Sequence, residues 1–181
     1  ALAWKLSEED FFKNWESNWL NTVKVRASYG EIGNENIASY YPYITPIRQG
    51  QYYTLGSSQV RVNGSAPSGI GNPEVKWETS TQFNVGADLM FIGGKLNVTA
   101  DYFIRKTDDI LLSQQIPRTS GFSSITRNVG GMENKGFEFT ADFKDNKGDF
   151  SYNINANMAF VKNKVTNLGT ANSLVAGFAY D

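Results

Sequence analysis

Strict two-residue alternation around a pair of glycines constrains this chain more than any other feature. Successive side chains of a β-strand point to opposite faces, so residues two apart share a face. The first apolar set is Phe83, Val85, Ala87, Leu89 and Phe91. The second is Leu96, Val98, Ala100, Tyr102 and Ile104. Gly93 and Gly94 lie between them and suit a tight turn. The pattern predicts a long hairpin with one apolar and one polar face.

The turn also fixes the register of this hairpin. A two-residue loop at Gly93 and Gly94 pairs every apolar residue with another apolar residue. The predicted pairs are Phe91–Leu96, Leu89–Val98, Ala87–Ala100, Val85–Tyr102 and Phe83–Ile104. A slip by one residue would move each apolar side chain to the opposite face, so pattern and turn agree on one pairing. What the apolar face contacts, a protein core or lipid, then decides the class of protein.

Three other segments alternate in the same way, at residues 20–30, 133–143 and 150–164. We expect a polar turn at residues 144–149 that joins the last two. The predicted pairs there are Phe143–Phe150, Ala141–Tyr152, Phe139–Ile154 and Phe137–Ala156. Residues 1–7 are typical of the end of a strand. The connector at residues 8–18 favours a helical turn with Ser7 as its N-cap.

The predicted strands are long, and their connections alternate between long and short. By pattern they span about 11 to 15 residues, against the five or six typical of globular sheets. Connections at 31–76 and 113–132 are long, whereas those at 93–94 and 144–149 are short. Transmembrane β-barrels have short periplasmic turns and long extracellular loops. Their aromatic girdle is predicted here from Phe91, Phe143, Phe150, Trp15 and Trp19. The alternative is a soluble β-sandwich, a surface module that binds carbohydrate or acts as an adhesin, because a sandwich gives the same alternation with inside and outside exchanged.

Composition excludes several functions. The net charge of −1 provides no basic field for nucleic acid. The chain contains no Cys and no His, which removes thiol nucleophiles, imidazole bases and the commonest zinc ligands. Carboxylate pairs such as Asp108–Asp109 are better explained by a strand boundary than by acid–base chemistry. We therefore expect no enzyme activity, no cofactor and no metal.

Several motifs, in order along the chain, resemble the signatures of SusC/RagA-type TonB-linked outer-membrane proteins of Bacteroidetes. They are AWKLSEE at 3–9, LNTVKVRASYGEIGN at 20–34, NPEVKWET at 72–79, DYFIRKTDDILL at 101–112, NVGGMENKGFE at 128–138 and NKV at 163–165. Each motif alone is weak, but together they cover nearly the whole chain and are specific.

The resemblance implies an all-β fold: an antiparallel, up-and-down transmembrane β-barrel segment. It implies about six to seven strands of a larger barrel of the 22-stranded, plugged class. All of residues 1–181 would belong to the barrel domain, with no plug domain in this chain. The implied function is active import of glycan oligomers, or less readily peptides, across the outer membrane. The implied partners are a SusD-like surface lipoprotein, outer-membrane lipid, and TonB acting through the plug.

Two groups of residues are candidates for function. Polar residues of the predicted strands would line the lumen: Lys24, Arg26, Asn84, Asp88, Asn97, Asp101, Arg105, Asn153, Asn155 and Asn157. Most of these are expected to make wall-to-wall or wall-to-plug hydrogen bonds. Tyrosines in the first long connection would contact a partner or a sugar, or pack the loop itself: Tyr40, Tyr41, Tyr43, Tyr52 and Tyr53.

Overall fold

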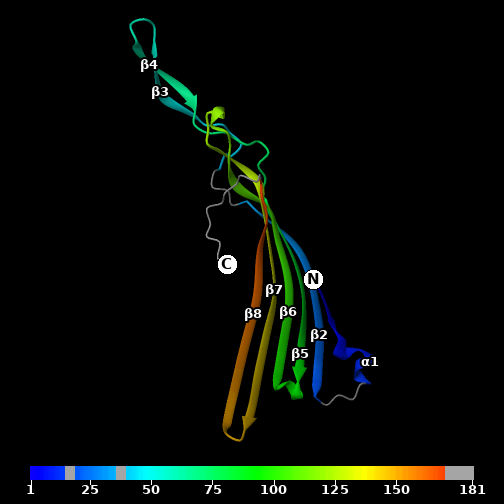
Figure 1. Cartoon of the computed structure of the whole chain (residues 1–181). Helices are drawn as coiled ribbons and strands as arrows, with labels where there is room; N and C mark the ends of the chain where they lie inside the picture. The colour runs from blue at the N-terminus through cyan, green and yellow to red at the C-terminus, as the bar shows by residue number, and fades with distance from the viewer. Residues whose placement is uncertain (15–18, 36–39, 170–181) are drawn as a thin grey trace. The chain divides into compact units, whose positions relative to one another are not determined.

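The computed structural model describes residues 1–14, 19–35 and 40–169 (Figure 1). Six strands form one sheet in the order β1-β2-β5-β6-β7-β8, and β3 and β4 form a separate two-stranded sheet. The strands of the larger sheet are β1 (Leu2–Lys5), β2 (Leu20–Asn34), β5 (Glu78–Phe91), β6 (Leu96–Gln115), β7 (Ser124–Lys147) and β8 (Phe150–Leu168). Apart from β3 and β4, strands that follow one another in the chain are neighbours in the sheet. This confirms the all-β, up-and-down architecture and the expected number of strands.

Helical segments are short. They are η1 (Leu6–Glu8), α1 (Asp10–Lys13), η2 (Ile92–Gly94) and η3 (Arg118–Ser120). The helical turn in the first connector is present, but its N-cap is Glu9, without a side-chain capping bond, and not Ser7. The predicted cap was wrong because residues 6–8 form a turn of their own before α1 begins. No helix in the described ranges is long and apolar enough to span a membrane.

The β5–β6 hairpin has the predicted register. Ser80 and Thr107 share a hydrogen bond of 2.8 Å, and Thr99 Oγ1 donates to Asp88 Oδ1 at 3.4 Å. Both are pairs that follow from placing Phe91 opposite Leu96. Lys95 N donates to Ile92 O at 3.2 Å, and Gly93 and Gly94 have φ of 63° and 86°. These angles match a type I′ turn, which strands tolerate because its twist matches their own.

The β7–β8 hairpin has a different register from the predicted one. Its turn is Gly148–Asp149, and residues 144–147 belong to β7. Asn155 Nδ2 donates to Asp142 Oδ2 at 3.5 Å, and Asn163 Nδ2 donates to Asn134 Oδ1 at 2.5 Å. These contacts place Phe143 opposite Ile154 and Phe137 opposite Phe160, not opposite Phe150 and Ala156. The slip is by an even number of residues, so apolar side chains still face apolar side chains.

The cause of that difference lies on the neighbouring strand. Lys144 N donates to Lys95 O at 2.8 Å, and Lys95 Nζ lies 2.7 Å from Asp145 Oδ1. Residues that resemble a polar turn are therefore held in the sheet by the end of the β5–β6 hairpin. This interaction joins distant parts of the chain and is not visible in the local sequence.

Strand β7 also begins earlier than predicted, at Ser124, so the connection before it covers only residues 116–123. Gly130 lies within the connection predicted at 113–132. A Cβ at position 130 would lie 2.8 Å from Cβ of Ile110 on β6, so this glycine permits close approach of two strands. The alternation of longer and shorter connections persists, with 35–77 and 116–123 against 92–95 and 148–149.

The first long connection contains a hairpin that the sequence did not predict. Strands β3 (Ile47–Leu55) and β4 (Val60–Pro67) pair antiparallel, with Tyr53 opposite Val62. Every residue of β3 is exposed. Because neither face of this hairpin is buried, its sequence carries no apolar alternation.

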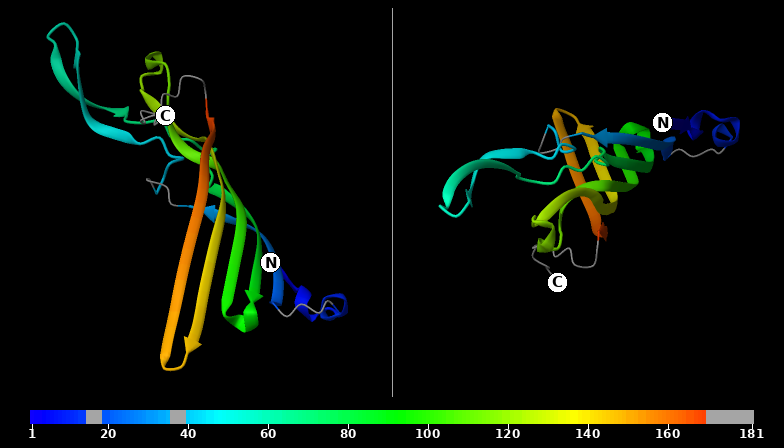
Figure 2. Two further views of the ribbon diagram at one scale, coloured as in Figure 1. Left: turned by 60° about the horizontal axis from the view of Figure 1, so that its bottom comes forward. Right: turned by 90° about the horizontal axis from the view of Figure 1, so that it is seen from above.

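The described chain forms two compact units. Unit 1 consists of the described residues within 1–32, 80–107 and 132–165, and unit 2 of those within 33–79, 108–131 and 166–169. In unit 1 the strands lie side by side in one layer (Figure 2). Its apolar face carries exposed large side chains, such as Phe83 at 43%, Phe137 at 41% and Phe160 at 60% exposure. No apolar side chain of the described ranges is buried. A soluble sandwich would cover this face with a second sheet, so the exposed face favours a barrel wall.

Aromatic side chains gather at the short-turn ends of unit 1. Trp19 stacks on Phe91 with ring centroids 5.6 Å apart and planes at 11°. Tyr152 lies 6.0 Å from Phe143 and 5.9 Å from Phe150, measured between ring centroids. Apart from Trp15, which lies outside the described residues, the predicted girdle residues are therefore at this end. Aromatic rings with polar edges are enriched where a membrane meets water.

Candidate functional site

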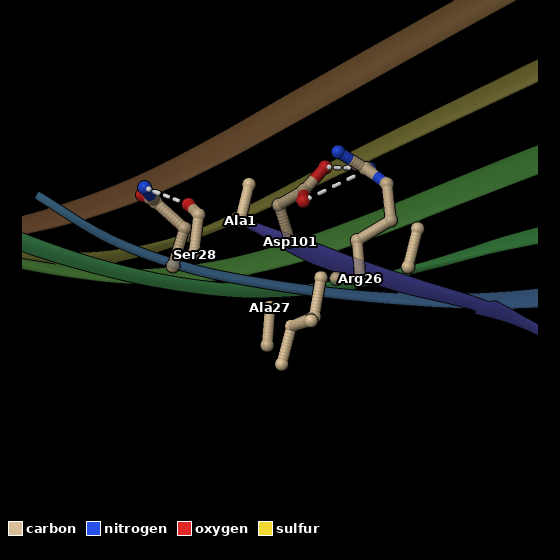
Figure 3. A pocket seen from close by; sticks show the side chains of 9 residues that line it. Ala1, Arg26, Ala27, Ser28 and Asp101 are labelled. Atoms are coloured by element: carbon tan, nitrogen blue, oxygen red, sulfur yellow. Dashed lines mark hydrogen bonds and ion pairs between the residues drawn. The ribbon is translucent and has the colours of Figure 1, made fainter.

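The polar face of unit 1 holds a network of ion pairs centred on Arg26. Its Nη2 donates to both carboxylate oxygens of Asp101 at 3.0 Å, and its Nε lies 3.0 Å from Asp88 Oδ2. Lys24 Nζ approaches the same Asp88 oxygen at 3.8 Å. Figure 3 shows the guanidinium of Arg26, on β2, turned toward Asp101, on β6. The Arg26 side chain therefore reaches over the intervening strand β5.

A glycine makes this reach possible. Gly86 lies on β5 between the two partners, and a Cβ there would overlap Oδ1 of Asp101 and lie 3.1 Å from Nη2 of Arg26. Glycine in the middle of a strand weakens the strand, so it commonly marks a close approach of another group. Here that group is the Arg26–Asp101 pair. The sequence pattern predicted that both charged residues lie on the polar face. It did not indicate that Gly86 determines their contact.

Amides and hydroxyls continue the polar face beside these ion pairs. Asn84 Nδ2 donates to Ser28 Oγ at 3.0 Å, and Gln82 Nε2 donates to Asn84 Oδ1 at 2.9 Å. A depression of about 450 Å³ lies against this surface. Its lining residues are Arg26, Ser28, Gln82, Asn84, Asp101, Phe103, Arg105 and Glu138. The surface offers hydrogen-bond donors and acceptors of both charges, together with one aromatic ring.

The structure therefore brings together most of the predicted lumen residues. Six of them, on β2, β5 and β6, either contact one another or line the same depression: Lys24, Arg26, Asn84, Asp88, Asp101 and Arg105. Asn97 is on the same face by its position in β6, one residue from Val98 on the opposite face. Asn153, Asn155 and Asn157 lie on the sheet-edge strand β8 and are exposed, and Asn155 contacts Asp142 on β7. They share the polar face without joining the Arg26 network.

The predicted tyrosines all belong to unit 2, and four of them form two groups. Tyr41 and Tyr43 meet edge to face, with ring centroids 6.3 Å apart. Tyr52 and Tyr53 are on β3, where the guanidinium of Arg61 lies 3.8 Å from the centre of the Tyr52 ring. Tyr40 is 95% exposed, and the other four are also exposed. A depression lined by Tyr41, Pro42, Ile44, Pro46, Gly69, Ile70 and Thr126 lies in the same unit.

Asn128 has a structural role in unit 2 that sequence reasoning missed. Its Nδ2 donates to Lys76 O at 2.7 Å and to Asp109 O at 2.8 Å, and its Oδ1 accepts from Lys76 N at 3.0 Å. Lys76 Nζ also pairs with Asp109 Oδ2 at 2.6 Å. Asp109 has a positive φ of 59°, an unusual conformation for a residue with a side chain. Asn128 thus holds the end of the first long connection against β6 and β7.

Replacing Asn128 with Ala should release that segment. Two backbone carbonyls and one backbone N–H lose their partner, and each lost hydrogen bond contributes about 0.5–1.5 kcal/mol. We expect hydrogen exchange of residues 72–78 in the full-length protein to accelerate by at least about tenfold. Asn63→Ala, on β4 of the same unit, is the control and should leave that exchange unchanged. Equal exchange in both variants would contradict the assigned role.

Unit 1 has long up-and-down strands with an exposed apolar face. Its polar face holds ion pairs across three strands. These features define part of the wall of a membrane β-barrel. The family described as TonB dependent receptor-like, beta-barrel, matches residues 1–179. The chain belongs to this family.

Curated relatives and solved structures agree with this assignment. The chain is 36% identical over 175 residues, 96% of its length, to TonB-dependent receptor P3 of Formosa agariphila, of which it covers 17%. It is 33% identical over 171 residues, 93% of its length, to TonB-dependent receptor SusC of Bacteroides thetaiotaomicron, of which it also covers 17%. A structure of the RagAB peptide transporter superimposes with a TM-score of 0.73 at 26% identity, over 92% of this chain and 18% of that one. The chain therefore spans less than a fifth of the length of these relatives.

Proposed function

We propose that this chain is part of the barrel wall of a TonB-dependent importer in the outer membrane of a bacterium of the Bacteroidetes type. The observation that carries the proposal is the two-faced sheet, whose apolar side is exposed and whose polar side holds the Arg26 network. Residues 1–181 would all lie in the barrel domain. The plug that responds to TonB would be another part of the same protein. In this proposal the chain has a transport role and catalyses no reaction.

Glycan oligomers are the proposed substrate class. The polar face presents amides, hydroxyls and charges of both signs, beside Phe103, and such a surface suits ligands rich in hydroxyl groups. The resemblance to SusC supports the same class. Peptides are the second candidate, favoured by the similarity to structures described as a peptide transporter and a peptide importer.

An uptake experiment separates these substrates. A strain lacking the gene would be complemented with the full-length protein and supplied with labelled glycan oligomers or labelled peptides, with and without TonB. We expect TonB-dependent accumulation of the glycan. Accumulation of peptide alone would show that the substrates are peptides and not glycans. If neither substrate accumulated, the proposed import function would be wrong.

We also propose that the tyrosines of unit 2 contact a SusD-like surface lipoprotein. Exposed Tyr side chains combine large contact area with few rotatable bonds, and they are enriched among residues that dominate binding energy. Tyr52 and Tyr53 lie on an exposed hairpin, and Arg61 stacks on Tyr52. The hairpin therefore presents ordered aromatic surface.

Changing both Tyr52 and Tyr53 to Ala should weaken the complex with the lipoprotein by at least tenfold in dissociation constant, since dominant residues contribute about 2 kcal/mol or more. Surface-immobilised lipoprotein and the purified full-length barrel would provide the measurement. Thr54→Ala, on the same strand, should change the constant less than about threefold, as rim residues do. An unchanged constant in the double variant would assign the tyrosines to loop packing.

A further inference from the structure

A cluster of lysines interrupts the outward face of unit 1. Lys106 on β6 lies two positions from Ile104, and Lys135 on β7 lies two positions from Phe137, so both share the apolar face. Lys162 and Lys164 follow Phe160 on the same face of β8 and are exposed. None of these lysines belongs to the Arg26 network, which occupies the opposite face.

One carboxylate joins these cations. Glu133 on β7 is only 17% exposed, and its Oε1 lies 2.9 Å from Lys135 Nζ while its Oε2 lies 3.9 Å from Lys106 Nζ. The Asn134–Asn163 hydrogen bond fixes the local register, which places Glu133 opposite Lys164 and Lys135 opposite Lys162. The four lysines outnumber the two carboxylates placed on this face, Glu133 and Asp108, so the cluster keeps a net positive charge.

The position of the cluster on the strands is informative. The apolar band runs from the short turns at Gly93–Gly94 and Gly148–Asp149 up to Ile104, Phe137 and Phe160, and the lysines come next in each strand. Short turns of such barrels are periplasmic and long connections extracellular. The lysines are therefore at the outer-leaflet border of the lipid-facing surface. Their aliphatic stems can lie on the apolar band while the ammonium groups reach the headgroup layer.

We propose that Lys106, Lys135, Lys162 and Lys164 form a binding site for the phosphate of an anionic lipid headgroup in the outer leaflet. Charge favours this occupant over a second copy of the chain, because a symmetric contact would bring the same positive patch against itself. Glu133 holds Lys106 and Lys135 on one side of the site and leaves Lys162 and Lys164 for the ligand. The proposal rests on the outer-membrane placement given above.

The test uses the full-length protein in lipid nanodiscs of phosphatidylethanolamine, titrated with lipid A and followed by native mass spectrometry. The double change Lys162→Gln and Lys164→Gln should raise the apparent dissociation constant for lipid A by roughly thirtyfold, as expected when two interfacial cations are removed. The matched control is Lys147→Gln, which lies at the short-turn end of the same hairpin. It should leave the constant unchanged. Inorganic phosphate, at a concentration equal to that of the lipid A phosphate groups, should not displace lipid A from the protein.

Glu133→Gln gives a second, opposite result. Removing the carboxylate frees Lys106 and Lys135, so lipid A binding should tighten by several-fold. Heat-modified migration on gels reports barrel folding for every variant, and labelled-glycan uptake reports the proposed import function separately. Equal lipid A binding by wild type, the double lysine variant and Glu133→Gln would overturn the site. A change in oligomeric state without a change in lipid binding would assign the patch to a protein contact and overturn it equally.

Discussion

Val98→Arg is expected to destabilise the barrel by about 2–4 kcal/mol, the cost of an arginine on the lipid face near the bilayer midplane. Val98 lies in the middle of the apolar band of β6, opposite Leu89 in the register confirmed by the Ser80–Thr107 and Asp88–Thr99 contacts. A guanidinium there must lose its hydration or distort the bilayer. The full-length protein, refolded into vesicles and titrated with urea, provides the measurement.

Asn97→Arg is the matched control for this prediction. Asn97 is the preceding residue on the same strand, and the alternation of a strand places it on the polar face. An arginine on that face meets water or polar partners, so the expected cost is within about 0.5 kcal/mol, as for surface substitutions in general. Similar costs for the two variants would mean that the apolar face of β6 does not meet lipid.

Gly86→Val is expected to destabilise the protein by about 1–3 kcal/mol, because the new side chain overlaps the carboxylate of Asp101 and separates it from Arg26. A hydrogen bond to a charged group contributes about 1.5–3 kcal/mol. The Arg26 and Asp101 side chains are 38% and 27% exposed, so solvent screening lowers the free energy that their hydrogen bonds contribute. Urea unfolding of the full-length protein measures the loss.

Two comparisons isolate the contribution of the ion pair. Gly30→Ala is the control, since a Cβ at that position on β2 meets no heavy atom within 4 Å. In an Asp101→Ala background, Gly86→Val should lose at least half of its cost, because the two substitutions remove the same contact and cannot be additive. Fully additive costs would show that Gly86 acts only through strand propensity.

The registers of the two hairpins show how far local pattern reaches. For β5–β6, Gly93–Gly94 is the only turn signal between two apolar runs, so the sequence determined the pairing. For β7–β8, residues 144–149 offered several polar positions for a turn, and registers that differ by an even number of residues keep the same faces. Lys144 N donates to Lys95 O on the adjacent strand and Asp145 pairs with Lys95 Nζ, so these residues stay in the sheet and the turn comes later, at Gly148–Asp149.

The candidate site shows the same limit. Arg26, Asp88 and Asp101 were identifiable from their places on polar faces. Which of them meet depended on the order of strands in the sheet and on the space left by Gly86. The role of Asn128 was hidden for a related reason, because its partners, Lys76 and Asp109, are on segments that only the fold brings together.

The sequence by itself determined which residues share a face of each strand, the class of fold and the family, because alternation, turn glycines and motifs are local properties. The tertiary structure decided where β7 begins, which polar residues contact one another and where the lysines lie at the end of the apolar band. These features depend on register between strands, and register is set by contacts between residues far apart in the chain. The register of the β5–β6 hairpin could be predicted locally, because its own turn and pattern specify the pairing.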